Sequence, residues 1–156
     1  MMKLFVMFGT LIAFIYVISA LEHNELRKDS HDVADVRITD ESVLQPVRKQ
    51  LEAYNNRDIS RFVESFSEDI ILYDLQSGEV LCEGKDRMIG IYGDMFAQSP
   101  KLNCFLLNRI HCGDFVIDEE VVHGIRGNNK VHGTAIYEIK DSLIIKAWFI
   151  KGKVNI

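Results

Sequence analysis

The segment of residues 46–74 (PVRKQLEAYNNRDISRFVESFSEDIILYD) constrains the fold most, because its hydrophobic period changes along its length. Residues 47–54 place apolar side chains three and four positions apart, which is typical of one face of an amphipathic helix. Asp58 is placed to cap a second, short helix, because a carboxylate accepts the unpaired N–H groups of a first helical turn. Residues 70–73 then form a β-like run that ends on Asp74. This order of elements is uncommon, so it narrows the set of folds open to the chain.

One more helix and a series of strands complete the predicted domain. Residues 85–98 repeat apolar side chains with a helical period, and Pro100 marks the end of this helix. Beyond Pro100 the period changes to two, which predicts antiparallel strands joined by short turns. The expected strands are residues 79–82, before this helix, and residues 102–112, 115–125, 131–139 and 143–150 after it. We therefore predict an α+β fold, with three helices between about Ser42 and Gln98 packed on a strongly curved, mostly antiparallel sheet.

Residues 1–20 differ in composition from the rest and have the pattern of a secretory signal. Lys3 supplies a positive start, residues 4–18 are almost wholly apolar, and Ser19-Ala20 ends the segment with small side chains. This apolar run is shorter than the about 20 residues of a spanning helix. We predict that residues 1–20 are removed and that the protein is secreted or periplasmic; the alternative is a membrane anchor formed by an uncleaved segment 4–20. The predicted flexible arm is residues 21–40, and the predicted domain is residues 41–152.

Charge and residue spacing exclude several classes of partner. The formal net charge is −5, and −6 without the signal segment, so no general attraction to nucleic acid is expected. His23 and His31 are too far apart for the one-turn spacing of a histidine metal site, and no metal or cofactor is predicted. Cys82, Cys104 and Cys112 are predicted to be small buried hydrophobes; the alternative is a disulfide, which would have to include Cys82.

The predicted strand of residues 115–125 has two ionisable side chains on one face. Alternate side chains share a face of a strand, so Glu119 and His123 lie together with apolar neighbours. One interpretation is an acid–base pair in a pocket, since each would need a partner if buried. The other is a solvated strand end with both side chains in water. The opposite, outer face of the sheet is expected to carry Asn103, Phe105, Leu107, Arg109, Val116 and Val122, a mixture compatible with a dimer rim.

Three segments resemble one known superfamily, in the same order. They are AYNNRDISRFVESFSEDIILYD, EGKDRMIGIYGDMF and IKDSLIIKAWFIKG, and the resemblance covers about residues 42–152. They look like the cone-shaped α+β proteins that include nuclear transport factor 2, the SnoaL-like polyketide cyclases and ketosteroid isomerase. The resemblance implies a cone-shaped NTF2-like fold. It implies little about chemistry, because this scaffold hosts enzymes, binders and adaptors.

The resemblance to ketosteroid isomerase implies a role for Asp74. This residue falls at the position of the general base, a carboxylate in a partly apolar pocket. Tyr92 matches a supporting tyrosine of that family. Gln50 stands where the isomerase has its oxyanion tyrosine, and Ala135 stands where it has a protonated aspartate, so ketosteroid isomerase activity itself is not implied. The alternative role for Asp74 is structural, as an acceptor of backbone N–H groups in the turn at residues 75–78.

Two functions follow from these observations. The first is a pocket that binds a small hydrophobic molecule, either as a binder or as an isomerase- or cyclase-type enzyme in which Asp74 is the base and His123 relays the proton. The second is a non-catalytic dimerisation or docking module, for instance a homodimer, that uses the outer face of the sheet. Aromatic side chains at this spacing suit a core as well as a pocket. The predicted substrate-binding residues are Gln50, Tyr54, Tyr92, Glu119, Tyr137 and Trp148.

Overall fold

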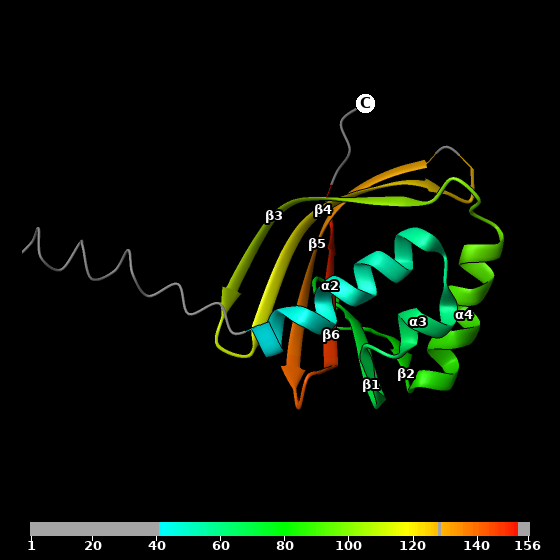
Figure 1. Ribbon diagram of the computed structural model, residues 1–156. Helices are drawn as coiled ribbons and strands as arrows, with labels where there is room; N and C mark the ends of the chain where they lie inside the picture. The colour runs from blue at the N-terminus through cyan, green and yellow to red at the C-terminus, as the bar shows by residue number, and fades with distance from the viewer. Residues whose placement is uncertain (1–40, 128, 153–156) are drawn as a thin grey trace, which may run out of the picture. The chain divides into compact units, whose positions relative to one another are not determined.

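The computed structural model describes residues 41–127 and 129–152, and within them the chain forms three helices and six strands (Figure 1). The helices are α2 (Glu41–Asn56), α3 (Ile59–Val63) and α4 (Lys85–Ala97). The strands are β1 (Phe66–Asp74), β2 (Val80–Glu83), β3 (Asn103–Cys112), β4 (Phe115–Ile125), β5 (Asn129–Lys140) and β6 (Leu143–Lys151). The predicted signal segment and arm lie outside the described residues. Within the described part, no helix is long and apolar enough to cross a membrane.

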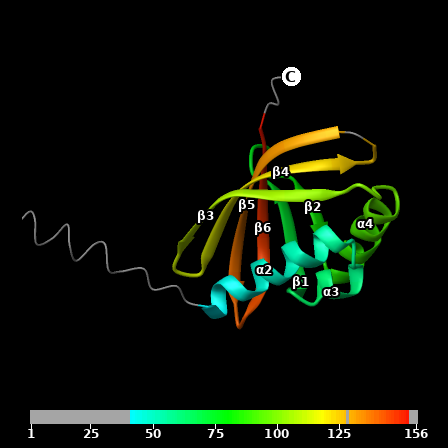
Figure 2. The same cartoon turned by 45° about the horizontal axis from the view of Figure 1, so that its top comes forward.

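The six strands form one sheet in the order β2-β1-β6-β5-β4-β3. All neighbouring strands are antiparallel except β1 and β6, which pair in parallel. Figures 1 and 2 show the long strands β3, β4 and β5 bending over α2, which lies on the concave side of the sheet. The predicted α+β fold, with three helices packed on a curved and mostly antiparallel sheet, is therefore confirmed.

Local hydrogen bonds set the turn between α2 and α3. Asp58 caps α3 as predicted, because its carboxylate accepts a hydrogen bond from the backbone N–H of Arg61 at 3.0 Å. Arg57, which precedes the cap, has a φ of 56° and donates from its guanidinium to the carbonyl oxygens of Asn55 and Leu102. These bonds join the turn to the residue that precedes β3.

β1 begins earlier than the sequence pattern predicts, at Phe66 rather than at residue 70. The polar residues 67–69 have the composition of a loop, which hid this start. The partner strand decides the conformation. Phe66 pairs with Ile144 of β6, and the carbonyl oxygen of Ser65 accepts the backbone N–H of Ile144 at 2.9 Å. Pairing with a neighbouring strand therefore overrides the local preference of these side chains.

The core lies between the helices and the concave face of the sheet. Val47 of α2, Ile70 of β1, Met88 of α4 and Val116 of β4 are all completely buried there. Beside them is an aromatic cluster in which ring centroids lie between 4.8 and 6.5 Å apart. Its members are Tyr54, Phe62, Phe66, Tyr92 and Phe96. Aromatic rings bury large apolar areas, so this cluster fixes α2, α3 and α4 against the start of the sheet.

Candidate functional site

A cavity of about 290 Å³ lies between the helices and the concave face of the sheet. Its volume is at the lower end of the range of small-molecule sites, about 300–1,000 Å³. The wall is mostly apolar and aromatic, with contributions from the helices and from all six strands. Its polar groups include Gln50, Tyr54, Cys82, Tyr92, Cys104, Glu120, Tyr137 and Lys151.

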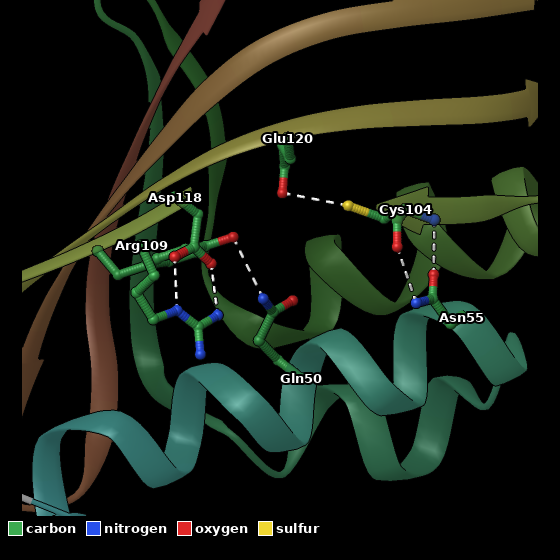
Figure 3. Close-up of polar contacts among 7 residues, drawn as sticks. Gln50, Asn55, Cys104, Arg109, Asp118 and Glu120 are labelled. Atoms are coloured by element: carbon green, nitrogen blue, oxygen red, sulfur yellow. Dashed lines mark hydrogen bonds and ion pairs between the residues drawn. The ribbon is translucent and has the colours of Figure 1, made fainter. Parts of the chain in front are cut away.

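Glu120 of β4 provides the only carboxyl among the described residues of the cavity wall. The thiol of Cys104 donates a hydrogen bond to its Oε2 at 3.3 Å, as Figure 3 shows. Burial raises the pKa of Glu120 above its ordinary value, and the nearby negative charge of Asp118 adds to this effect. Both influences disfavour the charged form of a carboxyl group. Glu120 therefore holds its proton more tightly than an exposed glutamate does.

Three tyrosines contribute phenol groups to the same cavity. Burial raises the pKa of Tyr54, Tyr92 and Tyr137, and the negative charge of Glu120 raises each of them further. All three hydroxyls are therefore protonated over the physiological range and can donate hydrogen bonds. Gln50 donates from its amide nitrogen to the Tyr137 hydroxyl oxygen at 3.2 Å, which orients this phenol.

A buried ion pair lies beside Glu120 on the inner face of the sheet. Arg109 of β3 donates two hydrogen bonds of 2.6 Å to the two carboxylate oxygens of Asp118 on β4 (Figure 3). The Arg109 side chain is 14% exposed and the Asp118 side chain 1%. Because alternate residues share a face, Asp118 and Glu120 point to the same side of β4. Both of these short hydrogen bonds from the Arg109 guanidinium go to Asp118, and Glu120 has no such bidentate contact with Arg109.

Asn55, the penultimate residue of α2, makes two hydrogen bonds to the backbone of Cys104. The Asn55 amide nitrogen donates to the Cys104 carbonyl oxygen at 3.0 Å, and the Cys104 backbone N–H donates to the Asn55 amide oxygen at 2.7 Å (Figure 3). The side chain thus substitutes for a neighbouring strand along the free edge of β3. This contact fixes the position of the thiol that meets Glu120.

The family is identified by a match that spans most of the domain. Residues 47–147 match the family model of the SnoaL-like domain. The chain belongs to the SnoaL-like family. No curated protein matches the sequence.

Solved structures of low sequence identity share the fold of this SnoaL-like domain. An uncharacterized cystatin-fold protein from Novosphingobium aromaticivorans has a TM-score of 0.64 and 21% identity, over 69% of this chain and 97% of its own. An NTF2-like protein from Cytophaga hutchinsonii has a TM-score of 0.61 and 13% identity, over 76% of this chain and 94% of its own. A protein with a ketosteroid isomerase-like fold from Catenulispora acidiphila, solved in complex with trimethylamine, has a TM-score of 0.58 and 17% identity, over 67% and 83%.

Four of the predicted substrate-binding residues of the SnoaL-like domain line the cavity, namely Gln50, Tyr54, Tyr92 and Tyr137. Trp148 does not, and it lies on the outer face of the sheet. Its ring stacks on that of Tyr73 at a centroid distance of 5.7 Å. A difference of one residue in register moves a side chain to the other face of a sheet, and this difference accounts for the misplacement of Trp148.

The predicted interior pair of Glu119 and His123 is wrong, because the two faces of β4 are reversed. Glu119 Oε1 lies 2.9 Å from His132 Nε2 on the outer face, and both side chains are half-exposed. The His123 ring packs against Phe105, also on the outer face, at 5.3 Å. The prediction placed the more apolar set of alternate residues inside. The set that faces the cavity instead contains Asp118 and Glu120, whose partners make their burial tolerable.

Asp74 lies at the end of β1 and does not line the cavity. Its Oδ1 accepts hydrogen bonds from the backbone N–H groups of Ser77 at 2.9 Å and Gln76 at 3.0 Å, and from the Ser77 hydroxyl at 3.1 Å. The backbone bond from Ser77 contributes most to a lowered pKa of Asp74, and its hydroxyl contributes next. A lowered pKa makes a weaker base. The predicted convergence of Asp74 with Glu119 and His123 on one cavity is therefore wrong, and this geometry matches the alternative role in the turn.

The outer face and the cysteines also differ from the predictions. Val116 and Val122 are buried in the core, and Arg109 points inward to Asp118. All three cysteines are free thiols, and Cys82 and Cys104 are buried, as predicted for small hydrophobic side chains. Cys112 is exposed, because it ends β3 beside the turn to β4.

Proposed function

We propose that this SnoaL-like protein binds a small, mostly apolar molecule in its cavity and that Glu120 is the ionisable group that acts on this molecule. The observation that carries the proposal is the position of this carboxyl in a mostly apolar and aromatic wall, where burial raises its pKa. Such a combination of an apolar pocket and a perturbed acid is typical of functional sites. The trimethylamine bound by the Catenulispora protein is an example of a small ligand held by a protein of this fold.

Proton transfer next to a carbonyl group is the reaction that best suits this arrangement. The ionised Glu120 would remove a proton from the carbon beside the carbonyl and return it to another carbon of the same substrate. A raised pKa makes the ionised carboxylate a stronger base. The hydroxyls of Tyr54 and Tyr92 would donate hydrogen bonds to the enolate oxygen that forms, since both stay protonated. In this proposal Glu120 replaces Asp74 as the base.

Glu120→Gln tests both the burial of this carboxyl and its role. Burial raises the folded-state pKa, so the native state holds this proton more tightly than the unfolded chain, whose glutamate has a pKa of about 4.3. The free energy of unfolding of the wild type therefore decreases as the pH rises from the unfolded-state pKa, about 4.3, through the higher folded-state pKa of Glu120. Glutamine cannot ionise, so we expect the variant to be about 0.5–3 kcal/mol more stable than the wild type at pH 8 and to lose this advantage at pH 4. Urea unfolding at the two pH values measures the difference.

The matched control for this experiment is Glu119→Gln, which removes the same charge from the outer face. Its partner contact with His132 is half-exposed, so we expect a change of less than about 1 kcal/mol. The same proteins then enter a thermal-shift screen against steroids, polyketide-like ketones and fatty acyl compounds. We expect hits whose binding changes in Glu120→Gln and is unchanged in Glu119→Gln. A screen without hits, or hits that bind both variants equally, would contradict the proposal.

A second candidate function is dimerisation through the outer face of the sheet. The observation that favours it is a group of exposed apolar side chains on the last two strands of one sheet edge, Phe105, Leu107, Ile110 and Phe115. Exposed apolar patches of this kind often mark contact sites between proteins. We expect twice the mass of the chain in sedimentation equilibrium at micromolar concentration. Ile110→Lys places a charge in this patch and is expected to weaken association at least about tenfold. A wild type that sediments as a monomer would rule out the homodimer.

A further inference from the structure

Glu120, the acid of the described cavity wall, has no cation paired with it. Glu120 is the only acid among its described residues, and the thiol of Cys104, a weak donor, makes its one side-chain hydrogen bond. Arg109 is held by two short hydrogen bonds to Asp118. Lys151 lies at the exposed end of β6, and the charges that act on Glu120 are those of Asp118 and Arg109. The ionised carboxylate thus has no close cationic partner of its own within the described wall.

The rest of the wall is suited to a positive charge. Tyr54, Phe62, Tyr92, Tyr137 and Phe149 line the cavity that contains Glu120. An aromatic ring attracts a cation to its face, and the attraction is largest where water is excluded. A ligand anion would be repelled by the negative charge of the ionised Glu120, whereas the charge of Asp118 on the same face of β4 is offset by Arg109. The wall therefore favours a cation over an anion of equal size.

We propose that the ligand of this cavity is a small apolar amine, with its positively charged nitrogen against Glu120 and its carbon groups against the aromatic wall. This inference rests on the binding part of the proposed function, a small and mostly apolar ligand beside Glu120, and specifies the class of that ligand; Glu120 then recognises a cation and does not act as a base on carbon. A bound ammonium group supplies the counter-charge that the carboxylate lacks, so ligand binding and ionisation of Glu120 favour each other. The cavity volume of about 290 Å³ restricts the ligand to a small molecule.

Choline and 3,3-dimethylbutan-1-ol test this proposal, because they have the same shape and differ in a permanent positive charge. Isothermal titration calorimetry of the wild-type chain at neutral pH measures the affinity for each probe. We expect choline to bind at least about tenfold more tightly than the alcohol, the size of one buried cation–aromatic contact together with an ion pair. In Glu120→Gln we expect this preference to fall below about threefold, with binding of the alcohol retained. In Glu119→Gln, the control on the outer face, we expect the preference to be unchanged.

The outcomes separate this proposal from the function on which it rests. If the alcohol binds the wild type at least as tightly as choline, the amine is wrong and a neutral ligand in the same cavity remains the function. If Glu120→Gln keeps the full preference for choline, the carboxylate is not the recognition group and the proposal is overturned. If neither probe binds, the amine is likewise wrong, and the screen of neutral compounds decides the proposed function independently.

Discussion

Arg109→Met is expected to lower the unfolding free energy by about 3–5 kcal/mol, because it leaves the Asp118 carboxylate buried without its counter-charge. The Asp118 side chain is only 1% exposed, and both of its carboxylate oxygens accept hydrogen bonds from Arg109 at 2.6 Å. Methionine keeps the length of the side chain and its apolar contacts, so the loss reports on the charge. Urea unfolding at pH 7 measures it.

Two further variants make this experiment decisive. Lys146→Met removes one partner of a more exposed pair, since the Lys146 and Glu138 side chains are 40% and 25% exposed, and we expect a loss of less than about 1 kcal/mol. The double replacement Arg109→Met with Asp118→Leu removes both buried charges, and we expect it to recover most of the stability lost in the single variant. If Arg109→Met proved as stable as Lys146→Met, the loss of the counter-charge of Asp118 would have no measurable effect on the unfolding free energy, which would contradict this prediction.

Phe62→Ala is expected to destabilise the domain by about 3–5 kcal/mol. Phe62 is 2% exposed and belongs to α3, the shortest helix, where its ring lies 4.8 Å from that of Tyr92 and 5.0 Å from that of Phe66. It also lines the cavity, so its removal joins new empty space to an existing void. The neighbouring rings are held by other contacts and cannot all collapse into this space.

The control for Phe62→Ala is the same replacement at Phe105, which is 53% exposed on the outer face. We expect Phe105→Ala to change the unfolding free energy by less than about 1 kcal/mol when the protein is dilute. Thermal unfolding followed by circular dichroism compares the two variants. Equal effects would mean that the aromatic cluster does not hold α3 in place.

The elements of the fold were predictable because their signals are local. The spacing of apolar residues in α2, the cap at Asp58 and the alternation after Pro100 act within a few residues, and the structure has each of them. The parallel contact of β1 with β6 joins distant parts of the chain, so no local pattern indicates where β1 begins. The pairing of Phe66 with Ile144 is what places the start of β1 at Phe66.

The candidate site was predicted less well, because each error depends on a partner in another strand. Alternation placed Arg109 outside, yet an irregularity of β3 between Leu106 and Asn108 shifts the register and turns Arg109 inward. The inward position of Arg109 provides the counter-charge of Asp118, so that the charged face of β4 can be the inner one. Glu120 was missed for the same reason. The available signal was the pair of carboxylates Asp118 and Glu120, two residues apart in one strand. A single sequence does not reveal which of the two is paired with Arg109.

The parallel pairing of β1 with β6 also constrains how the domain can form during synthesis on a ribosome. β1 is made early, whereas β6 is the last strand of the domain. In the finished sheet β6 lies between β1 and β5, so it alone joins the β1–β2 pair to the β3–β5 strands. A nascent chain that lacks β6 leaves a free edge on β1 and another on β5, and such edges pair readily with other chains. Escape from aggregation therefore depends on how quickly β6 is inserted once it has emerged from the ribosome.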